Sequence, residues 1–145
     1  MATIRPIKRT DYAAWLPLWH GYQRFYQVEL SEDVTNSTFE RFFDAAEPVH
    51  AAVAEADGLV GIVHWVYRRN TWTIPDVCYL HDLFVDPNQR GGRIGEALIA
   101  HVEAAARAHG CGQLYWLTQE SNATARRLYD RVATNTGFIR YRKML

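Results

Sequence analysis

Apolar residues recur at helical spacing over residues 12–26 of this chain, after a short β-prone stretch at residues 3–7. Thr10 and Asp11 stand just before this run and can cap a helix. Pro17 lies inside it, so we expect a kink or a new helix start there. The residues that form the pattern are Tyr12, Trp15, Leu18, Trp19, Tyr22, Phe25 and Tyr26.

The next segments predict a second helix and then a β-hairpin. Ser31 can cap the helix, whose expected packed face carries Val34, Thr38, Phe39 and Phe42. Residues 50–56 and 59–67 are typical of strands, and Asp57-Gly58 between them is typical of a hairpin turn. A further strand is expected from residue 76 onward, which gives an antiparallel meander.

The C-terminal half alternates helices and strands. An apolar stripe after Gly92 predicts a helix that ends at His109-Gly110, and residues 113–118 form the next expected strand. This β–α–β order makes that strand parallel to the central one, with a right-handed crossover. Asn122 can cap another helix, and residues 137–141 are expected to be the last strand. The sequence therefore predicts a single α/β domain over residues 1–145, with a central mixed sheet between layers of helices.

Composition and charge exclude several classes of protein. The 145 residues are 48% hydrophobic and 22% charged, and the formal net charge is zero, which supports neither general nucleic-acid nor general membrane affinity. No apolar run is long enough to span a bilayer, and the N-terminus lacks the apolar core of a signal peptide. Cys78 and Cys111 are isolated thiols without metal-ligand spacing. We expect a cytoplasmic protein without a metal site.

Residues 79–95, YLHDLFVDPNQRGGRIG, join a β-prone run to a Gly-rich turn and a helix start. Such a turn gathers unpaired backbone N–H groups at the positive end of a helix dipole, where a phosphate or pyrophosphate binds. Arg90 and Arg93 add formal charge. The stretch lacks the Lys-Ser/Thr ending of a P-loop and the G-x-G-x-x-G pattern of dinucleotide sites. Glycines before a helix are also ordinary turn residues.

This loop resembles the acetyl-CoA loop of the GNAT superfamily of N-acetyltransferases, Gln/Arg-x-x-Gly-x-Gly/Ala. Arg90 takes the first place and Gly95 the last, while Arg93 stands where the family has its first glycine. A residue inside the first helical turn needs no positive φ, so we expect the replacement to be accommodated.

A second stretch resembles the other signature of the same superfamily. Asn122 opens a helix, Tyr129 follows seven positions later, and Gly137-Phe138 comes after it. The resemblance covers nearly the whole chain and is tightest from residue 79 to residue 141. The run Leu80-His81-Asp82 is most similar to polyamine acetyltransferases, which carry Glu where this chain has His81, and about as similar to microbial histone-and-polyamine-type enzymes.

The resemblance implies that acetyl-CoA is the co-substrate and that the protein is a homodimer. The backbone of Leu83, Phe84 and Val85 should pair with the pantetheine arm and polarise the acetyl carbonyl, and Asn122 should hydrogen-bond that arm. The backbone amides of the Gly-rich loop and helix start should take the pyrophosphate, with Arg90 beside them. Those amides belong to Gly91, Gly92, Arg93, Ile94, Gly95 and Glu96.

Amine acetylation explains why a base is needed near the central strand. An alkyl amine with a pKa of about 10.4 is almost fully protonated at neutral pH, and exposing its lone pair costs roughly 4 to 5 kcal/mol. His81 occupies the matching position and can take a proton. Asp82 could attract the cationic acceptor or relay the proton through water. His81 could equally be a half-buried strand residue.

Tyr129 is the candidate acid and Tyr26 the candidate acceptor contact. The departing CoA thiolate belongs to a thiol with a pKa of about 8.5, and a phenol O–H aimed at that sulfur can donate a hydrogen bond or a proton. Helical spacing alone would make Tyr129 a core residue. Tyr26 could hold a cation against its ring face.

We therefore expect direct acetyl transfer to a small amine, such as a polyamine or an amino acid. Two other functions fit the sequence: acetylation of protein lysines or N-termini, and a non-catalytic acyl-CoA sensor. The replacement of Glu by His81 favours the sensor, and the presence of Tyr129 argues against it.

Overall fold

The computed structural model describes residues 1–89 and 93–145 and contains one mixed sheet with the strand order β1-β2-β3-β4-β5. Strands β1 to β4 are antiparallel, and β5 runs parallel to β4, as the sequence predicts. The helix α3 lies between β4 and β5 in sequence, so the parallel step is a β–α–β crossover. The strands are β1 Thr3–Pro6, β2 Val49–Ala56, β3 Gly58–Arg68, β4 Val77–Val85 and β5 Gln113–Tyr115.

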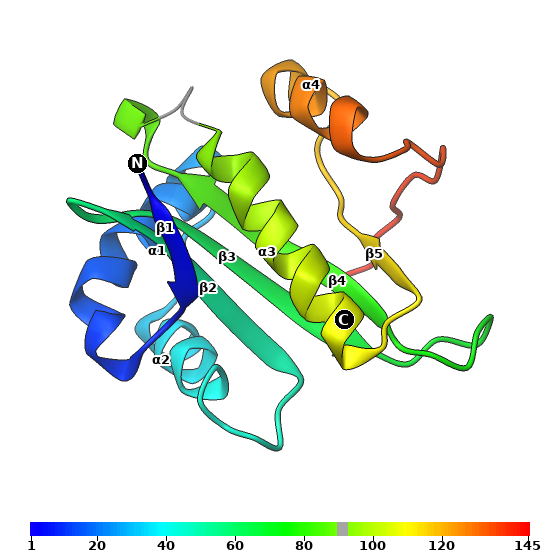
Figure 1. The fold of residues 1–145 in the computed structure, drawn as a ribbon, viewed down its shortest axis with the longest axis horizontal. Coiled ribbons are helices and arrows are strands. Elements are labelled where there is room, and N and C mark those ends of the chain that lie inside the picture. Colours follow the sequence, from blue (N-terminus) through cyan, green and yellow to red (C-terminus); the bar gives the residue numbers. More distant parts are fainter. Residues whose placement is uncertain (90–92) are drawn as a thin grey trace.

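Helices cover both faces of the sheet (Figure 1). The helix α3 crosses one face, whereas α1 and α2 lie on the other, and α4 stands beyond the end of β5. The three-layer arrangement confirms the predicted fold class. The helices are α1 Tyr12–Phe25, α2 Glu32–Arg41, α3 Ile94–His109 and α4 Ala123–Val132, with short 3₁₀ turns η1 Arg9–Asp11 and η2 Pro87–Gln89.

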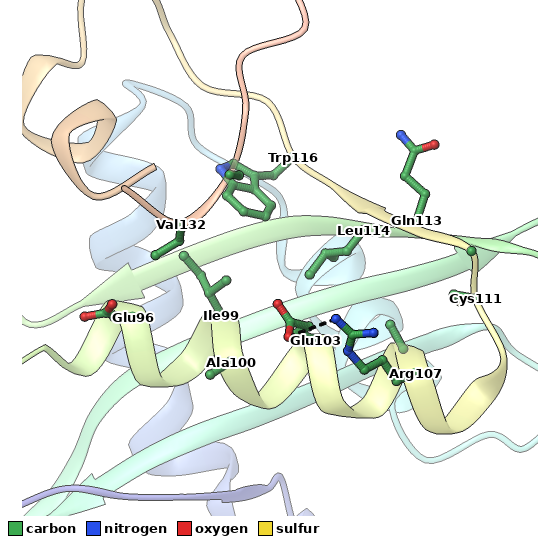
Figure 2. Close-up of a pocket in the computed structure, with 13 residues that line it drawn as sticks. Glu96, Ile99, Ala100, Glu103, Arg107, Cys111, Gln113, Leu114, Trp116 and Val132 are labelled. Carbon is green, nitrogen blue, oxygen red and sulfur yellow. Dashed lines mark hydrogen bonds and ion pairs between the residues drawn. The ribbon is translucent and has the colours of Figure 1, made fainter. Parts of the chain in front are cut away.

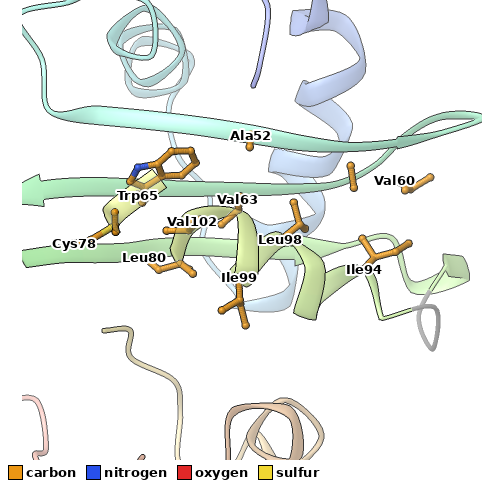
Figure 3. Packing of buried hydrophobic residues seen from close by; sticks show 12 residues of the cluster. Ala52, Val60, Val63, Trp65, Cys78, Leu80, Ile94, Leu98, Ile99 and Val102 are labelled. Carbon is orange, nitrogen blue, oxygen red and sulfur yellow. The ribbon is translucent and has the colours of Figure 1, made fainter. Parts of the chain in front are cut away.

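The core on the α3 side follows the apolar stripe predicted for that helix (Figure 3). Leu98 and Val102 are fully buried against the sheet, and each buried aliphatic side chain contributes about 1.5 to 3 kcal/mol. Gly110, at φ +91°, ends the helix in the left-handed conformation that glycine adopts without strain. The cluster consists of Ala52, Ala54, Val60, Val63, Trp65, Cys78, Leu80, Ile94, Leu98, Ile99, Val102 and Ala106.

The core on the α1 side is aromatic, and α1 continues through Pro17. Trp15, Leu18 and Trp19 are buried on the inner face of α1, whereas Pro17 is exposed. The predicted new helix start at Pro17 is therefore wrong. Packing on both sides of Pro17 outweighs the loss of one backbone hydrogen bond, a local cost of about 3 kcal/mol.

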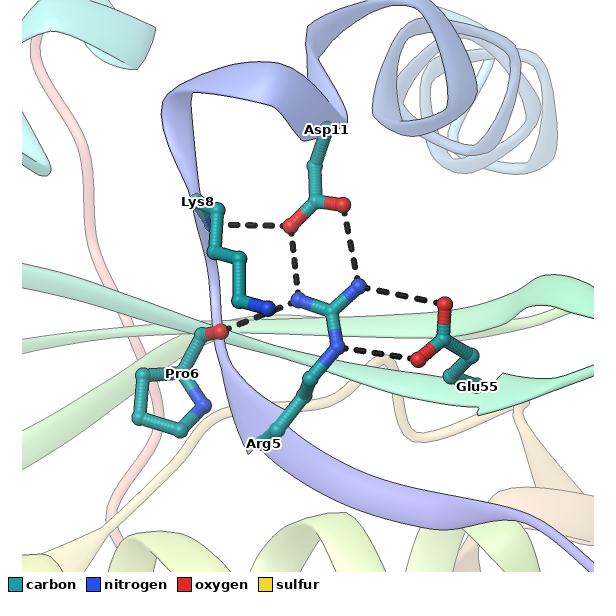
Figure 4. Close-up of polar contacts among 5 residues, drawn as sticks. All are labelled: Arg5, Pro6, Lys8, Asp11 and Glu55. Carbon is teal, nitrogen blue, oxygen red and sulfur yellow. Dashed lines mark hydrogen bonds and ion pairs between the residues drawn. The ribbon is translucent and has the colours of Figure 1, made fainter.

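The start of α1 also differs from the prediction. Asp11 occupies the N-cap position, but its side chain makes no cap hydrogen bond to α1. Its carboxylate instead accepts two hydrogen bonds from the Arg5 guanidinium, at 2.8 and 3.0 Å, and one from the Lys8 backbone N–H at 2.7 Å (Figure 4). Glu55 of β2 binds the other side of Arg5 at 3.1 Å. The group ties β1, β2 and η1 together.

The predicted cap of α2 is confirmed, because Ser31 accepts a hydrogen bond from Val34 N–H at 3.2 Å. The predicted inner face of this helix is partly wrong. Thr35 and Phe39 are buried, whereas Val34 is exposed. The face is set by contact with α1, where the Phe39 ring meets Tyr12 edge-on at 4.9 Å.

The C-terminal region departs most from the sequence prediction. The strand β5 ends at Tyr115, three residues before the expected end, and residues 137–141 form no strand. A strand requires a neighbouring edge as well as β-prone residues, and no described strand pairs with this segment. Phe138 and Tyr141 are consequently 80% and 89% exposed.

Candidate active site

A β-bulge in β4 creates the candidate site. Asp82 lies opposite His64 of β3, and Leu80 lies opposite Trp65, so His81 is an extra residue between the two pairs. An extra residue reverses which side of the sheet the following side chains face. Leu80 therefore packs on the α3 side, while Asp82 joins His64 on the α1 side.

His64, Asp82 and His81 form a continuous hydrogen-bonded group. Asp82 Oδ2 lies 2.9 Å from His64 Nδ1, and Asp82 Oδ1 lies 3.0 Å from His81 Nδ1. His64 is only 2% exposed and Asp82 only 6%, whereas the His81 side chain is 54% exposed. The group thus leads from the interior to one accessible imidazole ring.

The electrostatics of the group favour a charged Asp82 and a more basic His81. Burial alone would raise the pKa of the Asp82 carboxyl, but hydrogen bonds from His64 and His81 lower it below its usual range. The hydrogen bond to Asp82 in turn raises the pKa of His81, against the opposing effect of desolvation. A carboxylate that orients an imidazole in this way strengthens it as a base.

Three tyrosines surround this group. Burial and then the Asp82 charge raise the pKa of Tyr26, and the same two causes raise the pKa of Tyr22. Burial raises the pKa of Tyr129 to about 12, and the nearby Tyr26 adds to this shift. All three phenols therefore keep their proton at neutral pH. The structure brings the predicted residues Tyr26, His81, Asp82 and Tyr129 into one region.

The strands β4 and β5 separate beside this region. They pair only between Val77–Tyr79 and Gln113–Tyr115, and β4 then continues to Val85 with no described strand on that edge. Leu83, Phe84 and Val85 belong to the part of β4 beyond the last residue that pairs with β5. An extended ligand can add to such an edge as a strand does, so the geometry fits the predicted pantetheine contact.

The start of α3 holds the described part of the phosphate loop. Arg90, Gly91 and Gly92 lie outside the described residues. Arg93 has φ +59° and stands before the helix, so the expectation that it lies within the first turn without a positive φ is wrong. It is the N-cap residue, whose conformation is not helical, and here it is left-handed.

The first turn of α3 retains amide groups that suit an anion. Ile94, Gly95 and Glu96 are its first three residues, whose N–H groups have no intrahelical acceptor. A Cβ added at Gly95 would lie 3.5 Å from Leu128 Cδ2, an ordinary contact, so alanine also fits there. The Glu96 side chain bonds to Arg131 at 3.2 Å.

Asn122 opens α4, as predicted. Its Oδ1 accepts a hydrogen bond from Ala125 N–H, and its Nδ2 donates one to Thr118 Oγ1, both at 3.4 Å. These long bonds make Asn122 an N-cap that also holds the segment between β5 and α4. Tyr129 lies two turns further along α4, where its ring packs edge-on against Trp116 at 5.5 Å.

A groove of about 370 Å³ lies between α3 and β5 (Figure 2). Ile99, Leu114 and Trp116 form its apolar part, and Glu103 pairs with Arg107 along its wall. Glu96 is the one predicted site residue among those that line it. The groove is therefore separate from the His81 region.

Sequence reasoning left His64 out of the site and chose Tyr26 alone among the aromatic residues of this region. The apolar α3-side positions of β4 are Cys78 and Leu80 before His81, but Leu83 and Val85 after it. The apolar positions therefore change from even to odd residue numbers at His81, and this change in the alternation is the signal in the sequence that could have predicted the bulge.

Among the described residues, no group of His, Cys, Asp and Glu could hold a metal ion, and no helix is long and apolar enough to cross a membrane.

Comparisons with known proteins find relatives among the acetyltransferases. The model of the acetyltransferase (GNAT) family matches residues 15–133. The D-amino-acid N-acetyltransferase HPA3 of Saccharomyces cerevisiae is 31% identical over 143 residues, which cover 97% of this chain and 89% of that protein. The aminoglycoside N(6')-acetyltransferase type 1 of Klebsiella aerogenes is 27% identical over 132 residues, which cover 84% of this chain and 82% of that enzyme.

Solved structures share the fold. The structure of AAC(6')-Iy in complex with the bisubstrate analogue CoA-S-monomethyl-acetylneamine has a TM-score of 0.87 at 22% identity, covering 100% of this chain and 99% of that chain. The structure of the same aminoglycoside N-acetyltransferase in complex with CoA has a TM-score of 0.86, covering 100% and 96% of the two chains.

Proposed function

The chain belongs to the acetyltransferase (GNAT) family and is an acetyl-CoA-dependent N-acetyltransferase, and from this premise we propose that it acetylates the amine of a small acceptor by direct transfer. The acceptor class is a polyamine, an amino acid or a related primary amine. The observation that carries the proposal is the accessible His81 ring, held by the buried Asp82 beside the open edge of β4.

His81 acts as the base. Its Nδ1–H donates to Asp82 Oδ1, which leaves the Nε2 lone pair free to take a proton from the acceptor ammonium group. Asp82 orients the ring, because both of its oxygens already accept hydrogen bonds and its side chain is buried. In this proposal Asp82 takes an indirect part in binding a cationic acceptor, through its charge.

Tyr129 acts as the acid. Acetyl-CoA supplies the activated thioester, and the amine nitrogen forms a bond to the carbonyl carbon as the carbon–sulfur bond breaks. Tyr129, protonated because its pKa is raised to about 12, gives its proton to the departing sulfur. The amide nitrogen loses its second proton to the Tyr129 phenolate, and His81 releases the proton that it took to solvent, so the products are the amide, the CoA thiol and one proton.

The co-substrate site combines backbone groups from two elements. The backbone of Leu83–Val85 hydrogen-bonds the pantetheine arm and polarises the acetyl carbonyl. The first-turn amides of α3 donate hydrogen bonds to the pyrophosphate. Arg90, Gly91 and Gly92 complete this loop in the proposal. Arg93 contributes charge from its exposed side chain, and Asn122 faces the arm from α4.

Tyr26 contributes the aromatic wall of the acceptor site, beside Tyr22 and Asp82. The names of two relatives specify D-amino acids and aminoglycosides, which supports a small acceptor that carries an amine. The similarity of residues 80–85 to polyamine enzymes supports a polyamine within this class.

We also propose a homodimer in the reducing cytoplasm. Phe138, Ile139 and Tyr141 expose large apolar side chains in one short segment, which a second copy of the chain would cover. Cys78 and Cys111 are free thiols, in agreement with a reducing compartment.

The test combines thermal unfolding with a screen for thiol release. Acetyl-CoA at about 100 times its Kd should add roughly 2.7 kcal/mol to stability, and a nucleotide control should add much less. Small amines should then release CoA thiol steadily. Stabilisation without release by any amine, protein lysine included, would identify an acyl-CoA sensor and contradict the proposal.

Substitution of Tyr129 tests the assigned acid. Tyr129→Phe should lower kcat about 10²- to 10⁴-fold. The increase in thermal stability on binding acetyl-CoA should change little. Tyr12→Phe is the matched control, because the Tyr12 hydroxyl bonds to Asn36 on the α2 side of the molecule. Equal turnover in the two variants would remove Tyr129 from the mechanism.

A further inference from the structure

We propose that His64 and Trp15 are positioning residues that stabilise the charge of the Asp82 carboxylate and thereby set the basicity of His81. This inference rests on the proposed role of His81. It adds two buried residues from α1 and β3 that neither resemblance nor sequence pattern assigned to the site.

Trp15 determines the tautomer of His64. Trp15 Nε1 lies 3.1 Å from His64 Nε2 within the core. An indole nitrogen can only donate a hydrogen bond, so His64 Nε2 must accept it and carries no proton. The single ring proton of His64 is therefore on Nδ1.

The same logic continues through Asp82. His64 Nδ1–H donates to Asp82 Oδ2 at 2.9 Å, and a carboxylate can only accept. The other oxygen, Oδ1, remains available to His81 Nδ1–H at 3.0 Å. The indole N–H thus keeps the His64 proton on the nitrogen that faces Asp82. Asp82 accepts a hydrogen bond from each ring, and His81 keeps an unprotonated Nε2.

Burial makes this direction costly to reverse. Trp15 is fully buried and His64 is 2% exposed. The His64 ring is enclosed by Trp19 at 5.2 Å and Phe42 at 4.8 Å between ring centroids, so water does not compete for its nitrogens. An imidazolium at His64 would direct an N–H of its own at the Trp15 N–H and leave both donors unsatisfied.

Other titratable groups lie near the relay, by which we mean the hydrogen-bonded series Trp15, His64, Asp82 and His81. They do not change which group donates in each of its hydrogen bonds. Tyr22 of α1 and Tyr26, the C-cap residue of this helix, lie near Asp82 and stay protonated, because burial and the Asp82 charge raise the pKa of each. On the His81 side, Tyr79 shares β4, and Arg140 from the C-terminal segment opposes the rise in the pKa of His81. The main effect on His81 is its hydrogen bond to Asp82.

Removal of the His64 donor should make His81 harder to deprotonate. In His64→Leu, Asp82 loses one bond that stabilises its charge, so the carboxylate holds the His81 proton more strongly. The acid limb of the kcat/KM profile should move to higher pH by about one unit, with up to about tenfold lower kcat/KM at neutral pH. His64→Asn, of similar size but with an N–H at the same branch point, should restore most of the activity.

Removal of the Trp15 donor should have the opposite effect. In Trp15→Phe the ring still fills the core, but His64 Nε2 becomes free to take a proton. A charged His64 would then neutralise Asp82, which weakens its hold on the His81 proton. The acid limb should move to lower pH, and the rate on the plateau should fall because His81 is a weaker base.

Nitrogen-15 NMR of the histidine rings in the unmodified protein tests the tautomer without any turnover. A protonated Nδ1 and an unprotonated Nε2 on His64 between pH 6 and 8 would support the relay, and a protonated Nε2 would overturn it. Titration of His81 in the two variants should show the same opposite shifts as the kinetics. Shifts in one direction, or none, would overturn the positioning role even if His81 proves to be the base. Opposite NMR shifts without amine turnover would instead contradict the proposed function alone.

Discussion

At the scale of single residues, the structure shows polar side chains holding elements together in ways that their local sequence does not reveal. Asp11 illustrates this. Its position before α1 is typical of a capping residue, yet its carboxylate binds Arg5 and the Lys8 backbone instead. A charged partner on β1 competes successfully with the helix N–H groups, because charge-assisted hydrogen bonds are about twice as strong as neutral ones.

Asp11→Asn should destabilise the protein by about 1 to 3 kcal/mol at neutral pH, since Arg5 loses its two-point partner. The Arg5 hydrogen bonds lower the pKa of Asp11 below its ordinary value of 3.8. A lowered pKa gives stability that is complete above that value and is lost as the pH falls below it. Urea unfolding at pH 7 and near pH 3 should therefore show a smaller gap between variant and parent at the lower pH.

Glu55→Gln is the matched control for this network. Glu55 binds the same guanidinium from β2, but its side chain is 45% exposed. Solvent screens such a pair, so the loss should be clearly smaller than for Asp11→Asn. Equal losses for the two variants would show that Asp11 has no special part in joining β1 to η1.

At the scale of elements, α1 and β4 approach each other closely at Gly21. A Cβ at this position would lie 2.7 Å from Phe84 Cζ and 2.8 Å from Phe84 Cε2. Distances of this kind do not occur between real side chains, so the ring or the helix would have to move. The absence of a side chain at Gly21 therefore sets how near α1 lies to the strand that carries the candidate site.

Gly21→Ala should destabilise the fold by about 1 to 3 kcal/mol and raise the KM for acetyl-CoA, because Phe84 belongs to the proposed pantetheine edge. Gly112→Ala is the matched control, since its new Cβ would meet Pro75 at ordinary distances of 3.7 and 3.9 Å. Thermal unfolding and acetyl-CoA titration would compare the two. An equal KM increase in Gly112→Ala would contradict this placement of the co-substrate.

At the scale of the whole molecule, the C-terminal segment carries several large apolar side chains that are exposed. Phe138 and Tyr141 are among them, and neither packs on the sheet of its own chain. Val34 on α2 is also an exposed apolar residue, but it stands singly, as is common on protein surfaces. In the proposed homodimer, the C-terminal segment makes the contact with the second copy.

Phe138→Asp combined with Tyr141→Asp should weaken self-association at least tenfold, about 1.4 kcal/mol, as judged by sedimentation across a range of concentrations. Val34→Asp should leave the association unchanged. A parent protein that sediments as a monomer at all concentrations would contradict the homodimer without affecting the proposed chemistry.

The sequence by itself determined the type and order of the elements from β1 to α4, because hydrophobic periodicity and turn residues act over a few neighbouring positions. The hairpin at Gly58 and the caps at Ser31 and Asn122 are where they were expected. Recognition of two motifs also led to His81 and Tyr129, whose roles stay predictions until the variants are measured.

Tertiary structure alone decided which residues meet. Trp15 and His64 are 49 positions apart in sequence, and His64 and Asp82 are 18 apart, yet each pair shares a hydrogen bond in the core. The bulge at His81 makes this possible by turning Asp82 toward α1. Strand register, the course of α1 through Pro17 and the missing last strand depend on packing between distant segments. Local sequence does not encode these features, because the free energy that selects them arises only when those segments come into contact.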